Sequence, residues 1–239
     1  MPRILGRIDS HKRVNDILLG PLERPALKWL SEHMPTRVTP DKLTIVGIFG
    51  SVVVFAGYCL TFFDKNFLWL ASLGFIINWF GDSLDGTVAR LRDIQRPKYG
   101  FFVDHTTDAA SMVLVFSGLG ISPYVRMDIA LLTLVGYLLM SVLVYVRTCI
   151  IGEFRLSYGR LGPTELRLIA ITANTLVYFV GNPVLPTPLI SLTVYDLVAF
   201  LLAIGLMLVY AVSAIRQANS LATIDQPANI LKSGKPQIN

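Results

Sequence analysis

The sequence predicts an all-α polytopic membrane protein with six transmembrane helices, preceded by an amphipathic helix at the membrane interface. The first two observations concern composition: 53% of the 239 residues are hydrophobic and only 15% are charged, whereas a typical soluble domain has about 25% charged residues. The third is distribution, because the charged residues are concentrated between long uncharged segments. A soluble globule would have too little polar surface to cover so many apolar helices.

Most of the uncharged segments are long enough to cross a bilayer as helices. A hydrocarbon core of about 30 Å requires roughly 20 apolar residues at the rise of an α-helix. The long segments are residues 43–63, 129–146, 168–195 and 197–215. Two shorter segments, 67–81 and 109–125, are flanked by aspartates where one or two further turns would complete a crossing. We therefore predict six spans, two of which carry carboxylates in their terminal turns.

The basic residues orient these spans. Of the 21 Lys and Arg residues, all but Lys65 and Arg126 fall on one side of the six-span topology. The positive-inside rule places that side in the cytoplasm, together with both termini and the loop between the second and third spans. The net charge of +5 follows from this asymmetry and favours anionic lipid headgroups, so we expect no nucleic-acid partner.

The segments outside the spans are short. Residues 1–40 form a juxtamembrane leader, whose mixed apolar and charged pattern predicts one or two interfacial helices interrupted at Pro21 and Pro25. The glycine and three prolines of residues 181–188 predict an extracytoplasmic loop. A polar tail, 223–239, is expected to be disordered in the cytoplasm. The intervening residues 41–222 make one membrane domain without internal repeats.

Four aspartates lie around the loop between the second and third spans. Asp82 and Asp85 are three residues apart, and Asp104 and Asp108 are four apart, so each pair shares one helix face. Because the two helices are antiparallel neighbours, all four carboxylates can lie at one membrane depth. Carboxylates in this setting repel one another and are costly to desolvate, so they require cations between them. Hard oxygen ligands suit Mg²⁺ or Mn²⁺, and we predict two ions that bridge a phosphate.

The residues next to the aspartates fit a diphosphate ligand. Gly86 and Gly100 remove side chains at points where a ligand or a facing backbone must come close. Gly86 and Arg90 follow Asp82 by one and two helical turns, so they extend the aspartate stripe along the same face. From there the guanidinium of Arg90 can bind an anionic group.

Together these residues resemble the signature of the CDP-alcohol phosphotransferase (CDP-alcohol phosphatidyltransferase) family, D-x-x-D-G-x-x-A-R followed after a spacer by G-x-x-x-D-x-x-x-D. Every signature residue is present: Asp82, Asp85, Gly86, Ala89, Arg90, Gly100, Asp104 and Asp108. The spacer departs from the pattern, because the nine residues between Arg90 and Gly100 are one or two more than the family usually has. We expect the extra residue to bulge outward in the loop that contains Pro97.

The resemblance implies a membrane transferase of phospholipid biosynthesis, and by the same resemblance a homodimer. The donor would be a CDP-linked alcohol, often CDP-diacylglycerol, whose β-phosphorus is attacked by an acceptor alcohol with release of CMP. Asp82, Asp85 and Asp104 would hold metal, while Asp108 would be the general base that also touches the second ion. The residues expected against the CDP moiety are Gly86, Ala89, Arg90 and Gly100.

The acceptor alcohol is less well defined by the sequence, and four residues are candidates for contacting it: Arg147, Arg155, His105 and Glu165. Arg147 or Arg155 would bind a phosphate on the acceptor, as in the inositol-phosphate and glycerophosphate branches of the family. Both arginines also fit simple anchoring at the cytoplasmic surface. His105 and Glu165 resemble positions of the choline and ethanolamine branch.

Two other classes of membrane protein also use intramembrane aspartates. Intramembrane prenyltransferases bind diphosphates through aspartate-rich helices, but they normally have more spans and two separate aspartate motifs. A cation transporter with carboxylate ligands would leave the face from Gly86 to Arg90 unexplained, and the chain has no inverted repeat. Metal-dependent release of CMP from a CDP-lipid distinguishes the phosphotransferase from both alternatives.

Overall fold

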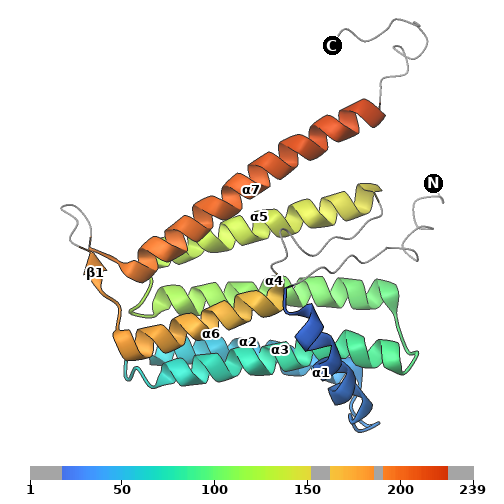
Figure 1. The fold of residues 1–239 in the computed structure, drawn as a ribbon, viewed down its shortest axis with the longest axis horizontal. Coiled ribbons are helices and arrows are strands. Elements are labelled where there is room, and N and C mark those ends of the chain that lie inside the picture. Colours follow the sequence, from blue (N-terminus) through green and yellow to red (C-terminus); the bar gives the residue numbers. More distant parts are fainter. Residues whose placement is uncertain (1–17, 152–161, 186–190, 226–239) are drawn as a thin grey trace, which may run out of the picture.

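A computed structural model of the chain describes residues 18–151, 162–185 and 191–225. The described residues form an almost entirely helical structure, as the sequence predicts, with one short hairpin (Figure 1). In chain order the elements are α1 (Gly20–Glu32), α2 (Pro40–Leu60), α3 (Phe67–Leu91), α4 (Pro97–Ile121), α5 (Met127–Ile151), α6 (Pro163–Val180), β1 (Val184–Leu185), β2 (Leu192–Thr193) and α7 (Val194–Ile224). The two strands pair antiparallel.

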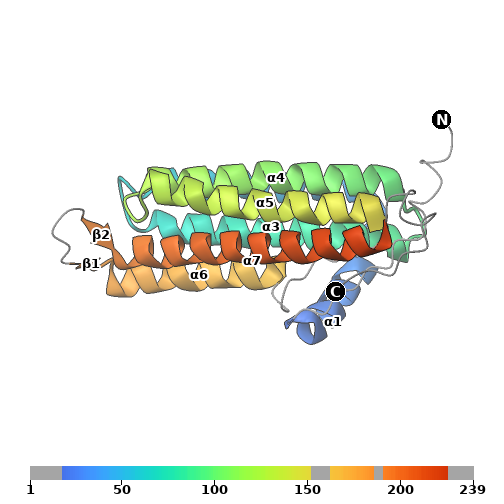
Figure 2. The ribbon, with the colours of Figure 1, turned by 90° about the horizontal axis from the view of Figure 1, so that it is seen from above.

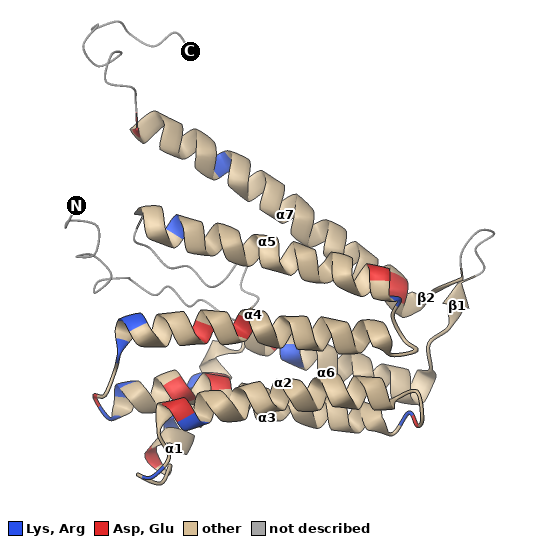
Figure 3. Ribbon diagram, turned by 180° about the vertical axis from the view of Figure 1, so that it is seen from behind, with Lys and Arg blue, Asp and Glu red and all other residues tan. Residues whose placement is uncertain are grey.

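The long helices run along roughly one axis, except for α7, which is inclined to the others (Figures 1 and 2). Helix α2 packs against α3 and α4, and α6 packs on α3. Helix α5 contacts α4 on one side and α7 on the other, and α7 diverges from the bundle toward its C-terminal end. Long stretches of α2, α5 and α7 are free of charged residues, while the aspartates of α3 and α4 lie toward one end of the bundle (Figure 3).

Glycines allow α2 and α3 to approach closely. A Cβ atom added at Gly81 of α3 would lie 2.2 Å from the backbone nitrogen of Gly47 on α2. A Cβ atom added at Gly50 would lie 2.3 Å from the backbone nitrogen of Asn78. Small residues at such a contact are typical of helix pairs in membranes, where van der Waals packing drives association. The contact fixes the face of α3 that carries Asp82 against α2.

Among the described helices, α2, α3, α5 and α7 are long and apolar enough to cross a membrane. Helices α4 and α6 do not meet that standard. The aspartates of α4, together with Glu165 and Arg167 in the first turns of α6, lower their mean hydropathy. The structure thus supports a multi-pass membrane protein.

Helix α1 and its linker hold the aspartate-bearing end of α3. Leu27 and Leu30 of α1 pack on a buried cluster formed by Leu43, Leu84 and Val88. The guanidinium of Arg92, directly after α3, donates to three backbone carbonyls of the linker, at 2.6 Å for Val38, 2.9 Å for Met34 and 3.0 Å for Pro35. Arg92 therefore joins the α1–α2 linker to the end of α3.

Two predicted boundaries were wrong, at the prolines of α1 and at Pro97. Helix α1 is continuous through Pro21 and Pro25, and Pro21 fits because a proline in the first turn removes no helical hydrogen bond. Within the uncharged segment 168–195, α6 ends at Val180 and Gly181 adopts a positive φ of 83° before the hairpin, so the helix ends where the glycine and prolines predict a loop. Pro97 lies in the first turn of α4 and not in the preceding loop.

Candidate active site

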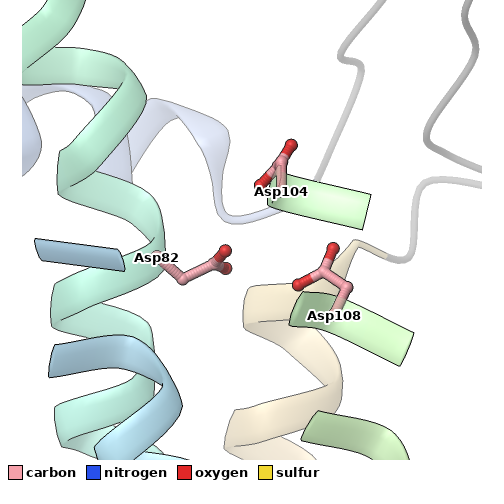
Figure 4. Close-up of side chains that lie close together, drawn as sticks. All are labelled: Asp82, Asp104 and Asp108. Carbon is pink, nitrogen blue, oxygen red and sulfur yellow. The ribbon is translucent and has the colours of Figure 1, made fainter. Parts of the chain in front are cut away.

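Three of the four predicted aspartates meet between α3 and α4. Asp82 extends from α3, and Asp104 and Asp108 extend from successive turns of α4, with the carboxylates directed toward one another (Figure 4). One carboxylate oxygen from each lies within 4.8 Å of the other two. The side chains are only partly exposed, so their mutual repulsion is weakly screened. This is the convergence that the spacing along the two helices predicts.

Asp85 lies one turn after Asp82 and makes a different contact. Its Oδ2 accepts a hydrogen bond from Thr44 Oγ1 of α2 at 2.7 Å, and its Oδ1 accepts one from the backbone N–H of Gly86. Among the described residues it stands outside the group of three. In this arrangement the fourth carboxylate is held beside the cluster by α2.

Arg167 of α6 is a site residue that the sequence interpretation missed, because it was counted only among the basic residues of the cytoplasmic side. Its Nη2 lies 2.5 Å from Asp82 Oδ2, and its Nε donates to Asn78 Oδ1 at 2.7 Å. The side chain is buried, and its Nη1 has no hydrogen-bond partner among the described residues. The available signal was helical spacing, since Arg167 and Asn174 are two turns apart on one polar face of an apolar helix.

Asn78 fixes the orientation of this arginine. Its amide nitrogen donates to the carbonyl of Gly47 and to the hydroxyl of Ser51, both at 3.0 Å, which leaves its oxygen directed at Arg167. Asn78 precedes Asp82 by one turn of α3, so the amide and the carboxylate bind neighbouring atoms of the same guanidinium. A small pocket beside this network is lined by residues of α2, α3 and α4: Thr44, Gly47, Ile48, Asn78, Asp82, Thr107, Asp108 and Ser111.

The two signature glycines differ from the packing glycines of α2 and α3. Outside its own helical backbone, no heavy atom of the described residues lies within 4 Å of a Cβ placed at Gly100. At Gly86 such an atom would meet only the flexible end of the Arg90 side chain, at 3.2 Å. A glycine inside a helix destabilises it by about 0.5–1 kcal/mol relative to alanine, and helix packing does not explain either position.

The other two residues expected against a CDP moiety continue along α3. Arg90 is exposed near the end of the helix, and its Nη2 donates to Thr87 Oγ1 at 3.1 Å. Ala89 is partly buried one residue earlier. Both belong to the same end of the bundle as the aspartates.

The candidate acceptor residues lie in different settings. Arg147 is on α5, and its Nε is buried without a hydrogen-bond partner among the described residues. The His105 ring stacks on Phe101 with centroids 4.1 Å apart, and its Nδ1 lies 3.6 Å from Asp104 Oδ2. Glu165 is buried and accepts backbone hydrogen bonds from Leu19 and Gly162. Arg155 lies outside the described residues.

The sequence pattern of the family described as CDP-alcohol phosphatidyltransferase matches residues 37–223. The chain belongs to this family. The match includes all eight signature residues together with every described helix from α2 onward, except the last residue of α7.

Similar proteins come from several branches of the family. Archaetidylinositol phosphate synthase of Pyrococcus horikoshii is 34% identical over 104 residues, which cover 44% of this chain and 52% of that protein. Cholinephosphotransferase 1 of Xenopus laevis is 27% identical over 200 residues, covering 75% and 46% respectively. The chain thus spans about half the length of these curated relatives.

The fold is also found in a solved member of the family. The crystal structure of Mycobacterium tuberculosis phosphatidylinositol phosphate synthase with CDP-DAG bound matches with a TM-score of 0.56. The match covers 87% of this chain and 99% of that chain, at 24% sequence identity.

The converging aspartates have the donor chemistry of a divalent-metal site. Asp82, Asp104 and Asp108 supply carboxylate oxygens close enough to share an ion, and hard cations such as Mg²⁺ and Mn²⁺ prefer such ligands. The guanidinium of Arg167 offsets part of their negative charge. The cluster therefore fits the metal that the sequence predicts.

Proposed function

We propose that the protein transfers a phosphoalcohol group, and specifically a phosphatidyl group, from a CDP-alcohol to an acceptor alcohol with release of CMP. The observation that carries this proposal is the convergence of Asp82, Asp104 and Asp108 beside two helical glycines that packing does not explain. Carboxylates supply metal ligands and a general base, and the open backbone at Gly86 and Gly100 admits a nucleotide. The sequences of relatives from the inositol-phosphate and choline branches support the same reaction type.

Two Mg²⁺ or Mn²⁺ ions would be held by Asp82, Asp104 and Asp108, with Asp85 adjacent. Bound there, they would neutralise the diphosphate and stabilise the leaving CMP. Asp85 is already oriented by Thr44, one turn from the cluster. A small movement of its side chain away from α2 would complete the predicted four-carboxylate set.

The chain's own residues would divide the remaining work. Asp108 accepts the proton of the acceptor hydroxyl. The hydroxyl oxygen then bonds to the β-phosphorus, and the bond between that phosphorus and the CMP oxygen breaks. Arg90 and the glycine faces hold the CDP moiety, which fixes the reacting atoms in line. Arg147 is our candidate for binding the acceptor phosphate. Its Nε is buried and has no hydrogen-bond partner among the described residues, which supports this role.

An apolar groove between α3 and α6 supports a lipid-linked donor. The groove has a volume of about 150 Å³ and is lined by Phe75, Ile76, Trp79, Thr164, Arg167, Leu168 and Ile171. Arg167 lies in the wall of the groove and also binds Asp82. A glycerolipid chain in this groove would therefore have its polar end beside the aspartates, as CDP-diacylglycerol requires.

The proposed membrane arrangement has six spans, α2 to α7, with the aspartates and both termini on the cytoplasmic side. Charge asymmetry is the support for this orientation. Residues 41–222 would form the membrane domain between an interfacial leader, 1–40, and a cytoplasmic tail, 223–239. The exposed face of α1, which carries Leu22, Trp29 and Lys28, suits an interfacial position. Homodimerisation remains a proposal from the family resemblance.

Purified protein supplied with CDP-diacylglycerol or CDP-choline, a panel of acceptor alcohols and Mg²⁺ tests the function. We expect CMP release that requires both the CDP-lipid and an acceptor, and that stops when the metal is chelated. Turnover of prenyl diphosphates would instead indicate the prenyltransferase alternative. Metal-ion flux into proteoliposomes without CMP release would indicate a transporter.

A further inference from the structure

Glu23 of α1 binds both α3 and α6. Its Oε1 accepts hydrogen bonds from the indole nitrogen of Trp79 at 2.8 Å and from the hydroxyl of Thr164 at 2.7 Å. The hydroxyl of Ser83 adds a longer contact to the same oxygen at 3.4 Å. Trp79 and Ser83 are one turn apart on α3, and Thr164 lies in the first turn of α6. A single carboxylate thus joins three helices.

The direction of this side chain is unusual for an amphipathic surface helix. Large apolar residues of α1, including Leu22 and Trp29, are exposed, whereas the acidic Glu23 is partly buried against the bundle. Hydrogen bonds to a carboxylate are stronger than those between neutral groups. The inward carboxylate therefore gives α1 a specific attachment point, beyond the contacts of its apolar residues Leu27 and Leu30.

A second contact fastens α1 to α6 at almost the same level. The backbone N–H of Leu19 donates to Glu165 Oε1 at 2.8 Å, while Glu165 Oε2 caps the start of α6 through the N–H of Gly162 at 2.9 Å. Figure 2 shows α1 leaving the bundle at a steep angle beside this end of α6. The start of α6 is therefore held by α1 as well as by α3.

Two of the residues bound by Glu23 also line the apolar groove between α3 and α6. Trp79 lines it from α3 and Thr164 from α6, and Arg167 lies one turn of α6 beyond Thr164. On the other side of the same helices, Arg167 binds Asn78 and Asp82. Two polar links, one at Glu23 and one at Arg167, thus connect α3 and α6 at the aspartate-bearing end of the groove.

We propose that Glu23 is a positioning residue that sets the width of this end of the groove and so determines how tightly the acyl chains of the lipid substrate are held. The inference rests on the proposed function, because it takes the groove as the lipid site. Loss of the carboxylate would free Trp79 and Thr164 to separate, and the groove would lose contact with a long chain. A donor with short chains, held mainly by its CDP moiety, would be affected little.

The test is calorimetric binding of CDP-dioleoylglycerol and of CDP-dihexanoylglycerol, with Mg²⁺, to the detergent-solubilised full chain. Glu23→Ala should raise the Kd for the dioleoyl donor by roughly tenfold, as expected for lost charge-assisted hydrogen bonds. The Kd for the dihexanoyl donor should rise by less than about twofold. Glu23→Gln keeps an acceptor oxygen for Trp79 and Thr164 and should recover most of the affinity. Glu32→Ala is the matched control, because Glu32 lies on the same helix and pairs only at 3.9 Å with Lys28.

The possible outcomes separate this inference from the proposed function. An equal loss of affinity for the two donors in Glu23→Ala, or unchanged binding of both, would overturn the role of Glu23. The proposed function would still stand in that case, because the wild-type protein binds the donors. A Glu23→Gln variant as weak as Glu23→Ala would also overturn it. Failure of the wild-type protein to bind either donor would contradict the proposed function and this inference with it.

Discussion

Arg167 on α6 and Asp82 on α3 form an ion pair that is buried on the arginine side and partly exposed on the aspartate side, with Nη2 of the arginine 2.5 Å from Oδ2 of the aspartate. Asp82 also shares the cluster with Asp104 and Asp108. The guanidinium therefore supplies positive charge to three carboxylates that would otherwise repel one another. Its remaining nitrogen, Nη1, is buried without a partner among the described residues and is available to an anionic ligand.

Removal of Arg167 should destabilise the metal-free protein. Removal of the guanidinium leaves the partly buried Asp82 carboxylate without its partner among like charges, so Arg167→Ala should lower the thermal unfolding temperature by several degrees. Added Mg²⁺ should recover part of the loss, because it replaces the missing positive charge. Arg126→Ala is the control, since Arg126 pairs with Asp128 at an exposed site. Similar losses in both variants, or no response to Mg²⁺, would contradict this role.

Gly100 should matter for the donor and not for the fold. The described part of the chain leaves the space around its Cβ position open, and alanine is the better helix former, so Gly100→Ala should unfold at the same or a slightly higher temperature. We expect its KM for the CDP donor to rise several-fold. Gly205→Ala, also in open space, should change neither quantity, and Gly81→Ala should disrupt the α2–α3 contact. Unchanged donor KM in Gly100→Ala would remove the glycine from the proposed CDP site.

The sequence predicted those parts of the structure that depend on local spacing. Aspartates three or four residues apart on adjacent antiparallel helices could meet in few other ways, and the structure confirms that Asp82, Asp104 and Asp108 do. The direction of Asp85 could not be predicted, because it depends on Thr44 of α2, 41 residues earlier in the chain.

Arg167 illustrates the same limit at longer range. The packing of α6 on α3 places it beside Asp82, 85 residues earlier in the chain, and spacing within α6 gives only the face on which it lies. The uncharged segment 168–195 was similarly ambiguous, because hydropathy does not register a turn made of apolar residues. The glycine at 181 and the following prolines gave the correct position for that turn, although the run of uncharged residues did not.

The loop between α3 and α4 should face the cytoplasm. In a variant without Cys59 and Cys149, a single cysteine at the exposed position Gln95 should resist a membrane-impermeant thiol reagent applied to intact cells. A cysteine at Lys65, in the exposed turn between α2 and α3, should react readily. The opposite labelling pattern would reverse the proposed orientation.

Arg147 should act on the acceptor side of the reaction. Arg147→Ala would remove ground-state binding of the acceptor phosphate, so the acceptor KM should rise by about tenfold or more while the donor KM changes little. Arg216→Ala removes an exposed arginine from the same end of the molecule, on α7, and should alter neither. Equal effects of Arg147→Ala on both substrates, or none, would leave it an anchoring residue.

The division of roles among the aspartates is the central claim. Asp108→Asn keeps the shape of the side chain and one acceptor oxygen but loses the charge and proton affinity of a base. Its turnover should fall by roughly 10² to 10⁴, while CDP-donor binding in Mg²⁺ falls much less. Asp82→Asn should lose binding and turnover together, because the diphosphate would meet uncompensated carboxylates.

The most direct measurement is the kcat for CMP release by Asp108→Asn, taken at saturating CDP-diacylglycerol and Mg²⁺ on protein whose donor affinity has been determined by calorimetry. We expect the kcat of Asp108→Asn to be at least about a hundredfold below that of the wild type, while the variant still binds the donor. A variant that binds the donor and releases CMP at a near-normal rate would contradict it.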